Sequence, residues 1–277
     1  MTVSAKDYRS SLKPVWCSGC GDYGVLKGLT QALSDLQVPP EKLALVSGIG
    51  CSSRLPGYTN SYAFNSVHGR ALPIAAGIKA ARPEMTTVVV GGDGDGFSIG
   101  VGHIPHAARR NPDMMYAVLD NGIYGLTKGQ ASPTTDPEFK QERGLAGEDE
   151  RPLKPVLFML GTGCGFVART HAGNLPHMRE IFREAIAYPG FAFVHVIAAC
   201  VTYQTPAYAK LLYERCELIP PDHDPTDLLA AVRMTQTPNI MLGVIYRRDP
   251  AHRAKGEVEM DEPRAAEVEV DKQGVEE

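Results

Sequence analysis

The sequence predicts an α/β fold in which a mainly parallel sheet is covered by helices on both faces. Short apolar runs of strand length alternate along the chain with segments whose apolar residues recur at helical spacing. The 277 residues are 43% hydrophobic and include 28 glycines, which is enough chain for one substantial core. Alternating strands and helices form right-handed βαβ units, so ligands are expected beyond the carboxyl ends of the strands.

The first half of the chain begins with a polar lead-in over residues 1–20. The next segment has apolar residues at helical spacing and stops before Pro39-Pro40, which predicts a helix followed by a loop. The expected elements are a helix over 25–36, a strand over 43–50, an extended segment over 62–67, a small-residue helix over 71–82, and strands over 86–92 and 114–120.

The second half continues the alternation with a strand over 156–163, an amphipathic helix over 177–188 and a strand over 191–200. The pattern is weaker beyond Cys200, where one helix over 226–234 and one strand over 239–247 are expected. We expect one domain over residues 1–215 and a C-terminal extension over 216–277. From about Gly256 the extension is acidic and poor in aromatic residues, which is typical of a disordered tail or an arm laid over a partner.

Charge and composition exclude several function classes. The net charge is −4 and no basic patch alternates with aromatic residues, so we expect no nucleic-acid partner. No apolar run reaches the roughly 18 residues that cross a bilayer, so we expect no membrane span. The amino terminus lacks the apolar core of a signal peptide, which favours a cytoplasmic protein with six reduced cysteines.

An acidic turn, Asp93-Gly94-Asp95-Gly96, follows the strand over 86–92, and Asn121 follows the next strand. A carboxylate and an amide at neighbouring strand ends, with a nearby carbonyl and a water, can hold Mg²⁺ together with two diphosphate oxygens. We expect the glycines to let the diphosphate approach the backbone, with Gly94 and Gly96 at positive φ. The alternative is an ordinary turn, since Asp and Gly are common turn residues.

The pair of motifs resembles that of the thiamine diphosphate enzymes, in which GDG is followed further along the chain by Asn. The resemblance implies a thiamine diphosphate-binding fold of the pyrophosphate-domain type. It also implies that Asp93 and Asn121 bind Mg²⁺ through their side chains and Ile123 through its carbonyl.

Four cysteines lie at loops or strand ends: Cys17 and Cys20 in a C-x-x-C, Cys51 in GIGCSSR, and Cys200. Such thiols could bind zinc or an iron–sulfur cluster, or could simply pack. Structural zinc sites usually contain two close pairs, whereas these dispersed residues favour a cluster held among several loops. Cys164 and Cys216 are expected to be small buried hydrophobic residues.

Several motifs together resemble the β subunit of two-subunit 2-oxoacid:ferredoxin oxidoreductases. They are WCSGCGD, GIGCSSR, HGRALPIAAGIKAARP, GGDGD and NGIYGLTKGQ. The resemblance is dense from Trp16 to about Pro133, recurs in GTGCGFVAR and around Cys200, and fades beyond about residue 215. It implies that Cys17, Cys20, Cys51 and Cys200 hold one 4Fe-4S cluster.

The remaining candidates surround the expected cofactor. His68 precedes a helix, where an imidazole and backbone amides can reach an anion. Arg54 and Lys128 are candidates for binding substrate carboxylates, and in the family a Lys in YGLTKGQ accompanies 2-oxoglutarate or broad 2-oxoacid use. We expect His68, Arg54 and Lys128 to act in catalysis. The expected cofactor-binding residues are Gly48, Ile49, Gly50, Ser52, His68, Gly69, Asp93, Gly94, Asp95, Asn121, Gly125, Leu126 and Thr127.

The resemblance implies oxidative decarboxylation of 2-oxoglutarate to succinyl-CoA and CO₂ in a reversible, coenzyme A-linked reaction, with electrons passing through the cluster to ferredoxin. Pyruvate or a broad range of 2-oxoacids is an alternative substrate. Thiamine diphosphate enzymes need a second domain that activates the aminopyrimidine, and this chain has room for one such unit, so we expect an α subunit and an (αβ)₂ assembly. Two functions outside this reaction also fit parts of the sequence. They are a non-redox thiamine diphosphate decarboxylase subunit and a non-catalytic zinc or electron-transfer module.

Overall fold

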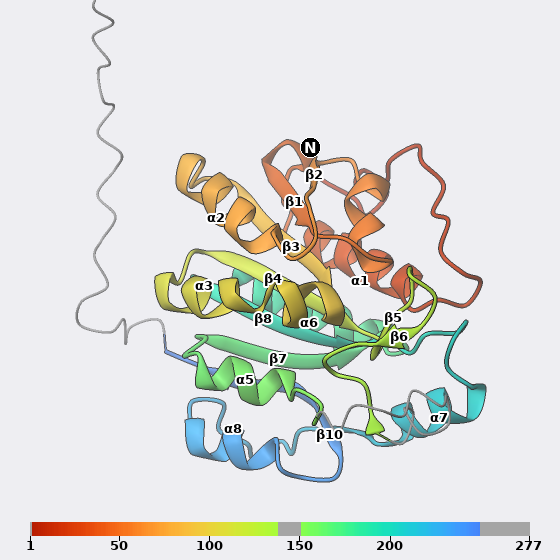
Figure 1. The fold of residues 1–277 in the computed structure, drawn as a ribbon. Helices are drawn as coiled ribbons and strands as arrows, with labels where there is room; N and C mark the ends of the chain where they lie inside the picture. Colours follow the sequence, from red (N-terminus) through yellow and green to blue (C-terminus); the bar gives the residue numbers. More distant parts are fainter. Residues whose placement is uncertain (1, 138–150, 250–277) are drawn as a thin grey trace, which may run out of the picture.

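One eight-stranded sheet organises the residues that this computed structural model describes, which are 2–137 and 151–249. The strand order is β2-β1-β3-β4-β8-β7-β10-β9, and the labelled strands follow it from top to bottom in Figure 1. All neighbouring strands are parallel except β10 and β7, which are antiparallel. The sheet therefore confirms the predicted α/β class. Its strands are β1 (Leu43–Ser47), β2 (Tyr62–Asn65), β3 (Thr86–Gly92), β4 (Met114–Asp120), β7 (Phe166–His171), β8 (Phe191–Ile197), β9 (Cys216–Leu218) and β10 (Ile240–Arg247).

Helices cover both faces of the sheet (Figure 1). The helices α1 (Asp22–Asp35) and α6 (Leu175–Ala187) pack on one face and contact each other. The other face is covered by α2 (Ala71–Ala81), α3 (Ile104–Arg110), α5 (Pro155–Gly161) and α8 (Leu228–Met234). Within the described ranges, no helix is both long enough and apolar enough to cross a membrane.

The central strands read as continuous apolar runs because both of their faces are buried. In β4, Met115 and Ala117 face α1 and α6, whereas Tyr116 and Val118 face the opposite helices. All seven residues of β4 are buried. Each strand therefore contributes to two cores, as expected for parallel strands covered on both sides.

One predicted strand is wrong. Residues 156–161 of this predicted strand belong to α5, and residues 162–163 follow the helix; the next strand along the chain is β7. Pro155 lies in the first turn of α5, where a missing N–H costs nothing, and Val156, Met159 and Leu160 are buried at helical spacing. The apolar run alone did not distinguish a short buried helix from a strand.

The segment after Cys200 adds α7 (Pro206–Glu214), which the sequence did not predict, and then β9. The predicted helix over 226–234 and strand over 239–247 correspond to α8 and β10. Both β9 and β10 extend the main sheet. The acidic tail from Gly256 lies outside the described residues.

Candidate functional site

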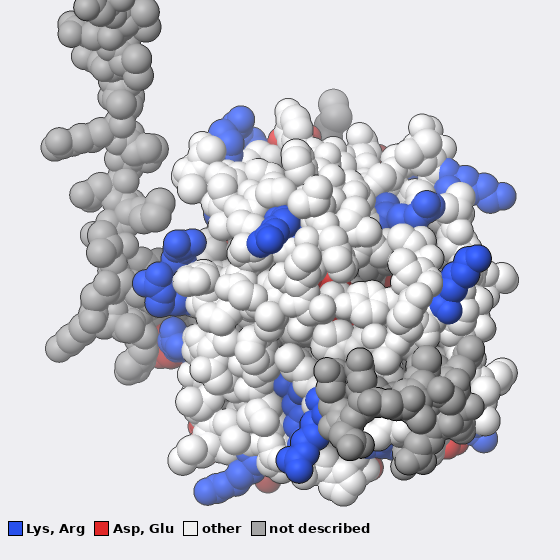
Figure 2. Space-filling model, viewed as in Figure 1, with Lys and Arg blue, Asp and Glu red and all other residues white. Residues whose placement is uncertain are grey.

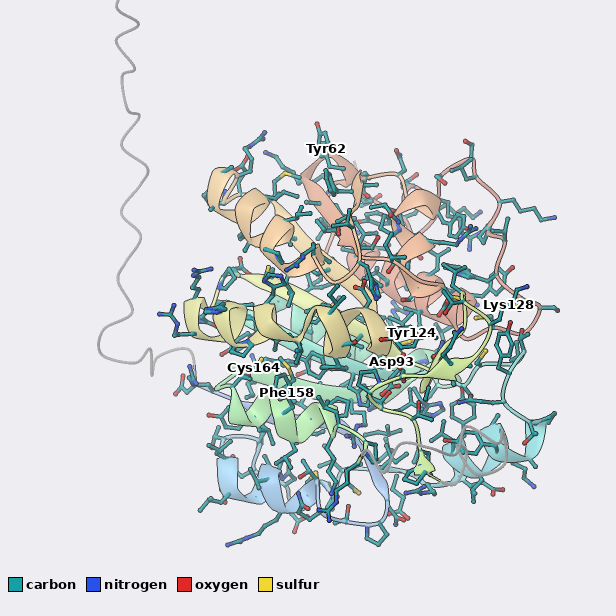
Figure 3. The ribbon with its side chains drawn as sticks, in the orientation of Figure 1. Tyr62, Asp93, Tyr124, Lys128, Phe158 and Cys164 are labelled. Carbon is teal, nitrogen blue, oxygen red and sulfur yellow. The ribbon has the colours of Figure 1, made fainter. Side chains whose placement is uncertain are left out.

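The predicted site residues gather at the carboxyl edge of the sheet. A small hairpin of β5 (Ile123–Tyr124) and β6 (Gln130–Ala131) follows β4 at this edge. Figure 3 shows Asp93 and Tyr124 close together, with Lys128 further out on the same loop. The Tyr124 hydroxyl donates a hydrogen bond of 3.3 Å to the carbonyl of Gly94, which joins the loops that follow β3 and β4.

Asp93 is a buried carboxylate with few donors. It is 2% exposed, and its Oδ1 accepts a long hydrogen bond of 3.3 Å from the backbone N–H of Asn121. Its Oδ2 accepts a 3.0 Å bond from the hydroxyl of Thr134, which also lies 2.8 Å from Oδ1 of Asp120. Burial, followed by the nearby Asp120 charge, raises the pKa of Asp93 to about 7. The buried carboxylates of Asp93 and Asp120 share the single hydroxyl proton of Thr134, so their negative charge favours the binding of a cation.

A buried chain of side chains continues from Asp120. Its Oδ2 lies 2.8 Å from Nε2 of His195 on β8, and Nδ1 of His195 accepts a 3.0 Å hydrogen bond from Nε of Arg169 on β7. Because Nδ1 is an acceptor, Nε2 carries the proton and donates it to Asp120. Burial lowers the pKa of His195, so the ring is neutral, while burial lowers the pKa of Arg169 to about 10 and leaves it cationic at neutral pH.

Asn121 lies between the carboxylates and the thiols. Its Oδ1 accepts the N–H of Ile123 at 2.9 Å, which forms a tight turn at the end of β4. The carbonyl of Ile123 accepts the N–H of Gly125 at 3.1 Å and keeps a second lone pair. The amide of Gly125, a predicted cofactor-binding residue, is therefore used within the loop. Asn121 and Ile123, two of the three predicted metal ligands, therefore lie in one turn at the end of β4.

Asp95 organises the neighbouring loops. This residue is 3% exposed, and its Oδ1 accepts the backbone N–H groups of Ile49 and Gly69 at 2.9 and 2.8 Å. The same oxygen lies 2.9 Å from Nδ1 of His68. Because Nδ1 is engaged by Asp95, the ring presents Nε2 for other contacts. Asp95 therefore fixes His68 and the loop after β1 through its Oδ1.

The predicted positive φ values at Gly94 and Gly96 are wrong. Gly94 has φ −66°, and neither glycine belongs to the set with positive φ. Close packing requires glycine instead. A Cβ at Gly94 would lie 2.2 Å from the Tyr124 ring, and one at Gly96 would lie 2.2 Å from the Tyr116 oxygen. Residues Asp95–Ile99 then form a π-helical turn, a feature that is frequent at functional sites.

This edge of the sheet fits a magnesium diphosphate. The oxygens of Asp93, Asn121 and Ile123 are hard ligands of the kind that Mg²⁺ prefers. A divalent cation would also relieve the unfavourable charge of the Asp93 and Asp120 pair. Gly94 has no side chain, so a diphosphate could approach the backbone of this loop closely. Asp93, Asn121 and Ile123 are the residues that would hold the metal.

The four predicted cysteines come from three segments of the chain, which are the C-x-x-C of Cys17 and Cys20, the loop of Cys51, and the segment after β8 that contains Cys200. None is in a disulfide; Cys17 is exposed, whereas Cys20, Cys51 and Cys200 are half-buried. A Cβ at Gly125 would lie 3.7 Å from the Cys51 sulfur, 4.0 Å from the Cys200 sulfur and 3.9 Å from Nδ2 of Asn121. Two thiols therefore adjoin the predicted magnesium loop.

The thiols influence one another electrostatically. Burial, then Asp22, raises the pKa of Cys20 to about 12, with smaller contributions from Cys51 and Cys200. Burial, again followed by Asp22, raises the pKa of Cys51 to about 11, and Cys17 and Cys200 also contribute. Such thiols stay protonated at neutral pH unless a metal takes their protons. The site thus favours thiolates only when a metal centre is present.

In the described parts of the chain, no three His, Cys, Asp or Glu side chains are close enough to share one metal ion. A structural zinc ion needs four donors on one atom. An iron–sulfur cluster is held by four separate thiolates around a larger body, and the sulfurs of Cys51 and Cys200 beside Gly125 fit two of its ligand positions. Cys17, Cys20, Cys51 and Cys200 are the residues that would hold it.

The two remaining cysteines differ. Cys164 is fully buried, as expected, and its thiol donates to the carbonyl of Phe166. Cys216 is only half-buried and lies near Arg169, whose charge partly offsets the effect of burial on the pKa of the thiol.

The other predicted residues line the same edge. Ser52 is buried, and its hydroxyl lies 3.3 Å from the position that a Cβ at Gly92 would take. Gly48 must be glycine, because a Cβ there would lie 2.0 Å from Asp95 Oδ2. The Thr127 hydroxyl donates to Oε1 of Gln130 at 2.6 Å, so it is engaged within its loop. Leu126 and Arg54 are exposed, and Gly50 has φ +131°.

Lys128 has a positive φ of 82°, an uncommon conformation for a residue with a side chain. Its backbone N–H donates to the carbonyl of Gly125, and the following Gly129 also has positive φ. The tight loop holds the exposed ammonium group at the outer side of the site (Figure 3). Strain of this kind is often kept at functional sites.

Sequence reasoning missed Asp120, Thr134, His195, Arg169 and Gln204. His195 and Arg169 each interrupt an apolar strand, and such an interruption is a signal that could have been used. Asp120 directly precedes Asn121 at the strand end and could have been found with it. Thr134 and Gln204 lie in loops without a distinguishing pattern, so only the tertiary structure identifies them.

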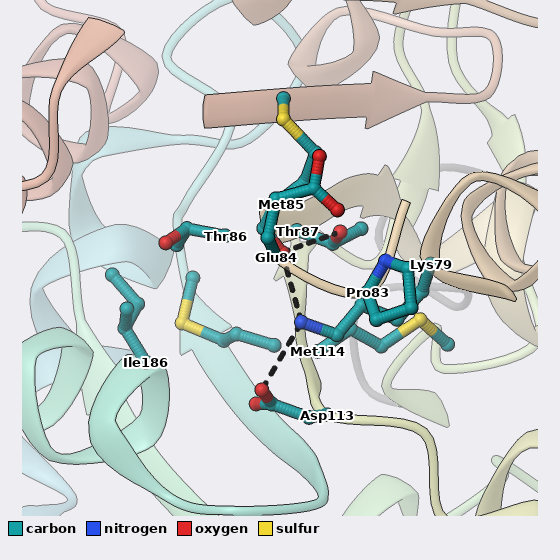
Figure 4. A pocket seen from close by; sticks show the side chains of 10 residues that line it. Lys79, Pro83, Glu84, Met85, Thr86, Thr87, Asp113, Met114 and Ile186 are labelled. Carbon is teal, nitrogen blue, oxygen red and sulfur yellow. Dashed lines mark hydrogen bonds and ion pairs between the residues drawn. The ribbon is translucent and has the colours of Figure 1, made fainter. Parts of the chain in front are cut away.

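A cavity of about 140 Å³ lies away from these groups, at the amino ends of β3 and β4 (Figure 4). Its lining includes Lys79, whose Nζ lies 3.1 Å from Asp113 and donates to the carbonyl of Met85 at 2.8 Å. Ligands of parallel sheets bind at the opposite, carboxyl edge. We therefore do not assign the cofactor to this cavity.

Two family models match consecutive parts of the chain. Residues 48–196 match the thiamine pyrophosphate enzyme C-terminal TPP-binding domain, which spans the Asp93 and Asn121 loops. Residues 200–258 match the C-terminal part of the pyruvate ferredoxin oxidoreductase beta subunit.

Relatives match over most of the chain. The 2-oxoacid:ferredoxin oxidoreductase 2 subunit beta of Aeropyrum pernix is 36% identical, over 89% of this chain and 84% of the relative. The 2-oxoglutarate synthase subunit KorB of Archaeoglobus fulgidus is 38% identical, over 76% and 80%. A solved structure of 2-oxoglutarate:ferredoxin oxidoreductase from Magnetococcus marinus, with 2-oxoglutarate, coenzyme A and succinyl-CoA bound, is 42% identical with a TM-score of 0.86, and covers 89% of this chain and 86% of that one.

Proposed function

This chain belongs to the β subunits of the 2-oxoacid:ferredoxin oxidoreductases, and we propose that it carries the diphosphate half of a coenzyme A-dependent 2-oxoglutarate:ferredoxin oxidoreductase. The reaction is the reversible oxidative decarboxylation of 2-oxoglutarate to succinyl-CoA and CO₂. One observation carries this proposal: Asn121 of the metal loop and the sulfurs of Cys51 and Cys200 all lie within 4.0 Å of the Cβ position at Gly125. A redox centre beside a cofactor loop is what an oxidative decarboxylation needs.

The proposed metal site is made of Asp93, Asn121 and the carbonyl of Ile123, with Mg²⁺ as the cation. Thiamine diphosphate supplies the electron sink that permits loss of CO₂ from a 2-oxoacid. The buried Asp93 and Asp120 pair attracts the cation, and Arg169 limits the excess negative charge through His195. The low exposure of Asp93 keeps water away from the metal oxygens, which strengthens their attraction for the cation.

Asp95 prepares the neighbouring part of the site. It orients His68 through Nδ1 and holds the amides of Ile49 and Gly69 in place. We assign to His68 a contact with the reacting groups through Nε2. The predicted cofactor-binding residues Gly48 and Ser52 lie within four residues of Cys51 in the sequence, so the same loop serves the cofactor and the thiols.

We assign a 4Fe-4S cluster to Cys17, Cys20, Cys51 and Cys200. An iron–sulfur cluster supplies one-electron acceptance and passes electrons outward. The Trp16 indole N–H donates to the Cys51 carbonyl at 2.7 Å and holds the Cys51 loop against the C-x-x-C of Cys17 and Cys20. Because Cys17 is exposed, the thiols reach the protein surface, where a ferredoxin can approach.

An α subunit that carries the pyrimidine-binding domain is the proposed partner, in an (αβ)₂ assembly. Exposed apolar side chains surround the site, and they are those of Ile49, Val67, Ile99 and Leu126. The face seen in Figure 2 is largely free of charge at its centre, with Lys and Arg side chains spaced around it. An uncharged surface around an incomplete site suits a partner that closes it.

Lys128 supports the choice of 2-oxoglutarate over pyruvate. The ammonium group can pair with the second carboxylate of the substrate, which pyruvate lacks. The names of the relatives include both 2-oxoglutarate and broader 2-oxoacid enzymes. A broad range of 2-oxoacids is the second candidate, since Lys128 is exposed and lies on a loop.

The experiment is co-expression with the neighbouring α subunit, followed by measurement of coenzyme A-dependent viologen reduction with several 2-oxoacids. We expect 2-oxoglutarate to be preferred, and Lys128→Met to raise its KM by about tenfold while that of 2-oxobutyrate changes little. Lys154→Met, at an exposed lysine on the α5 side, is the control. Preference for pyruvate in the wild type would overturn the substrate, and a colourless complex without viologen reduction would overturn the redox function.

A further inference from the structure

Gln204 joins the two halves of the site. The residue is 6% exposed and lies in the loop between Cys200 and α7. Its Oε1 accepts the backbone N–H of Cys200 at 2.6 Å, and its Nε2 donates to the carbonyl of Asn121 at 2.7 Å. One side chain thus bonds directly to the backbone of a proposed magnesium ligand and of a proposed cluster ligand.

The chemistry of the two partners requires an amide. The Cys200 N–H needs an acceptor, and the Asn121 carbonyl needs a donor. A carboxylate would satisfy the first partner and repel the second, while an apolar side chain would leave both buried groups unpaired. Glutamine is the side chain of this length that meets both demands.

The surrounding bonds make this connection rigid. The backbone N–H of Gln204 donates to the Cys200 carbonyl at 3.0 Å, which closes the loop that carries the cysteine. The Asn121 loop is held by the bond from the Ile123 N–H to Asn121 Oδ1, and the Thr135 hydroxyl binds the carbonyl of Gly122. A displacement of the Asn121 carbonyl is therefore transmitted to the Cys200 N–H through Gln204.

We propose that Gln204 is a positioning residue that couples occupancy of the magnesium diphosphate site to the environment of the Cys200 sulfur. This inference rests on the proposed function, because it assumes both cofactors. Binding at the metal loop fixes the Asn121 carbonyl, and Gln204 then fixes the backbone beside Cys200. Hydrogen bonding near the cluster sulfurs sets the reduction potential, so the cluster responds to the bound cofactor.

The proposed coupling acts in both directions, between cofactor binding and the oxidation state of the cluster. A ligand that changes the potential of the cluster must bind with a different affinity to its oxidised and reduced forms. The test measures the midpoint potential of the cluster by electron paramagnetic resonance in redox titrations of the αβ complex, with and without thiamine diphosphate and Mg²⁺. In the wild type we expect the added cofactor to shift the potential.

In Gln204→Met, which removes both hydrogen bonds, we expect most of that shift to disappear and the affinity for thiamine diphosphate with Mg²⁺ to fall by about tenfold. Gln204→Glu keeps the acceptor for Cys200 and is the second variant if the first does not fold; its affinity for the cofactor should also fall. Gln31→Met, at a half-buried glutamine in α1, should keep the wild-type potential shift and the wild-type affinity for thiamine diphosphate with Mg²⁺.

The outcomes separate the two proposals. A wild type that binds no thiamine diphosphate or shows no cluster signal overturns the proposed function. A wild type that holds both cofactors but shows no shift overturns the coupling alone. An unchanged shift of the midpoint potential in Gln204→Met also overturns the coupling. So does a variant in which only the cluster potential or only the affinity for thiamine diphosphate changes, because Gln204 would then act on a single loop.

Discussion

The carboxylate loops and the cysteine loops meet at Gly125 but are built differently. Asp93 and Asn121 end neighbouring strands of one sheet, and each already makes hydrogen bonds within a buried network. The four thiols come from three separate segments, range from exposed to half-buried, and have no single-ion geometry within the described residues. We therefore expect the carboxylate loops to form without a cofactor, and the thiols to be drawn together by the proposed cluster.

The strongest test of this difference removes one thiol. We expect Cys51→Ser in the αβ complex to lose nearly all visible absorption of the cluster and all viologen reduction, because every thiolate holds its own iron. Thiamine diphosphate binding should change much less, since the carboxylate loops form without the cluster. Cys216→Ser is the matched control and should keep the absorption. Full absorption in Cys51→Ser would contradict the ligand assignment.

The second test removes the buried carboxylate. We expect Asp93→Asn to weaken Mg²⁺-dependent binding of thiamine diphosphate by more than about 100-fold, while the absorption of the cluster remains. Calorimetric titration of the complex measures this affinity. Asp113→Asn, at the opposite edge of the sheet, should bind as the wild type does. If Asp93→Asn kept its affinity, the metal would have to lie elsewhere.

A smaller effect is expected behind the metal site. His195→Gln or Arg169→Met should weaken cofactor binding by about tenfold, because Asp120 would lose the donor that orients it and the cation that balances its charge. His177→Gln, which pairs with Thr170 outside the network, serves as the control in the same titration. Equal affinities in all three variants would mean that the metal loop does not depend on this support.

The last expected effect is on stability without cofactors. Burial, followed by Asp120, raises the pKa of Asp93 from an ordinary 3.8 to about 7, so the folded state binds this proton more tightly than the unfolded state. Stability should therefore fall as pH rises from about 4 to 7, by at most a few kcal/mol. Asp22, whose pKa burial raises to about 6, acts in the same direction.

Thermal unfolding of the complex in the presence of a chelator measures how stability depends on pH across the same pH range. Asp93→Asn should flatten it, whereas Asp113→Asn should not. The cysteine loops add nothing in this range because the pKa values of Cys20 and Cys51 lie at about 12 and 11. An identical slope in Asp93→Asn and the wild type would show that Asp93 is not protonated in the folded state.

The sequence predicted the elements around the metal site well. The predicted strands over 86–92 and 114–120 match β3 and β4, since both are apolar runs bounded by polar turns. Prediction failed at residues 156–163, because a short buried helix and a strand are equally apolar. The glycines of the acidic turn were identified, but for the wrong reason, since close contact with Tyr124 and Tyr116 requires them rather than positive φ.

By itself, the sequence determined the α/β class, the family, and the place of the carboxylate and amide groups at strand ends and of the thiols at loops or strand ends, because local periodicity and short motifs are encoded in neighbouring residues. Only the tertiary structure decided which distant groups support them. The bonds from Arg169 to His195 and Asp120, and from Gln204 to Cys200 and Asn121, join segments that mostly lie far apart in the chain. Such bonds depend on strand order and burial, which no local pattern records.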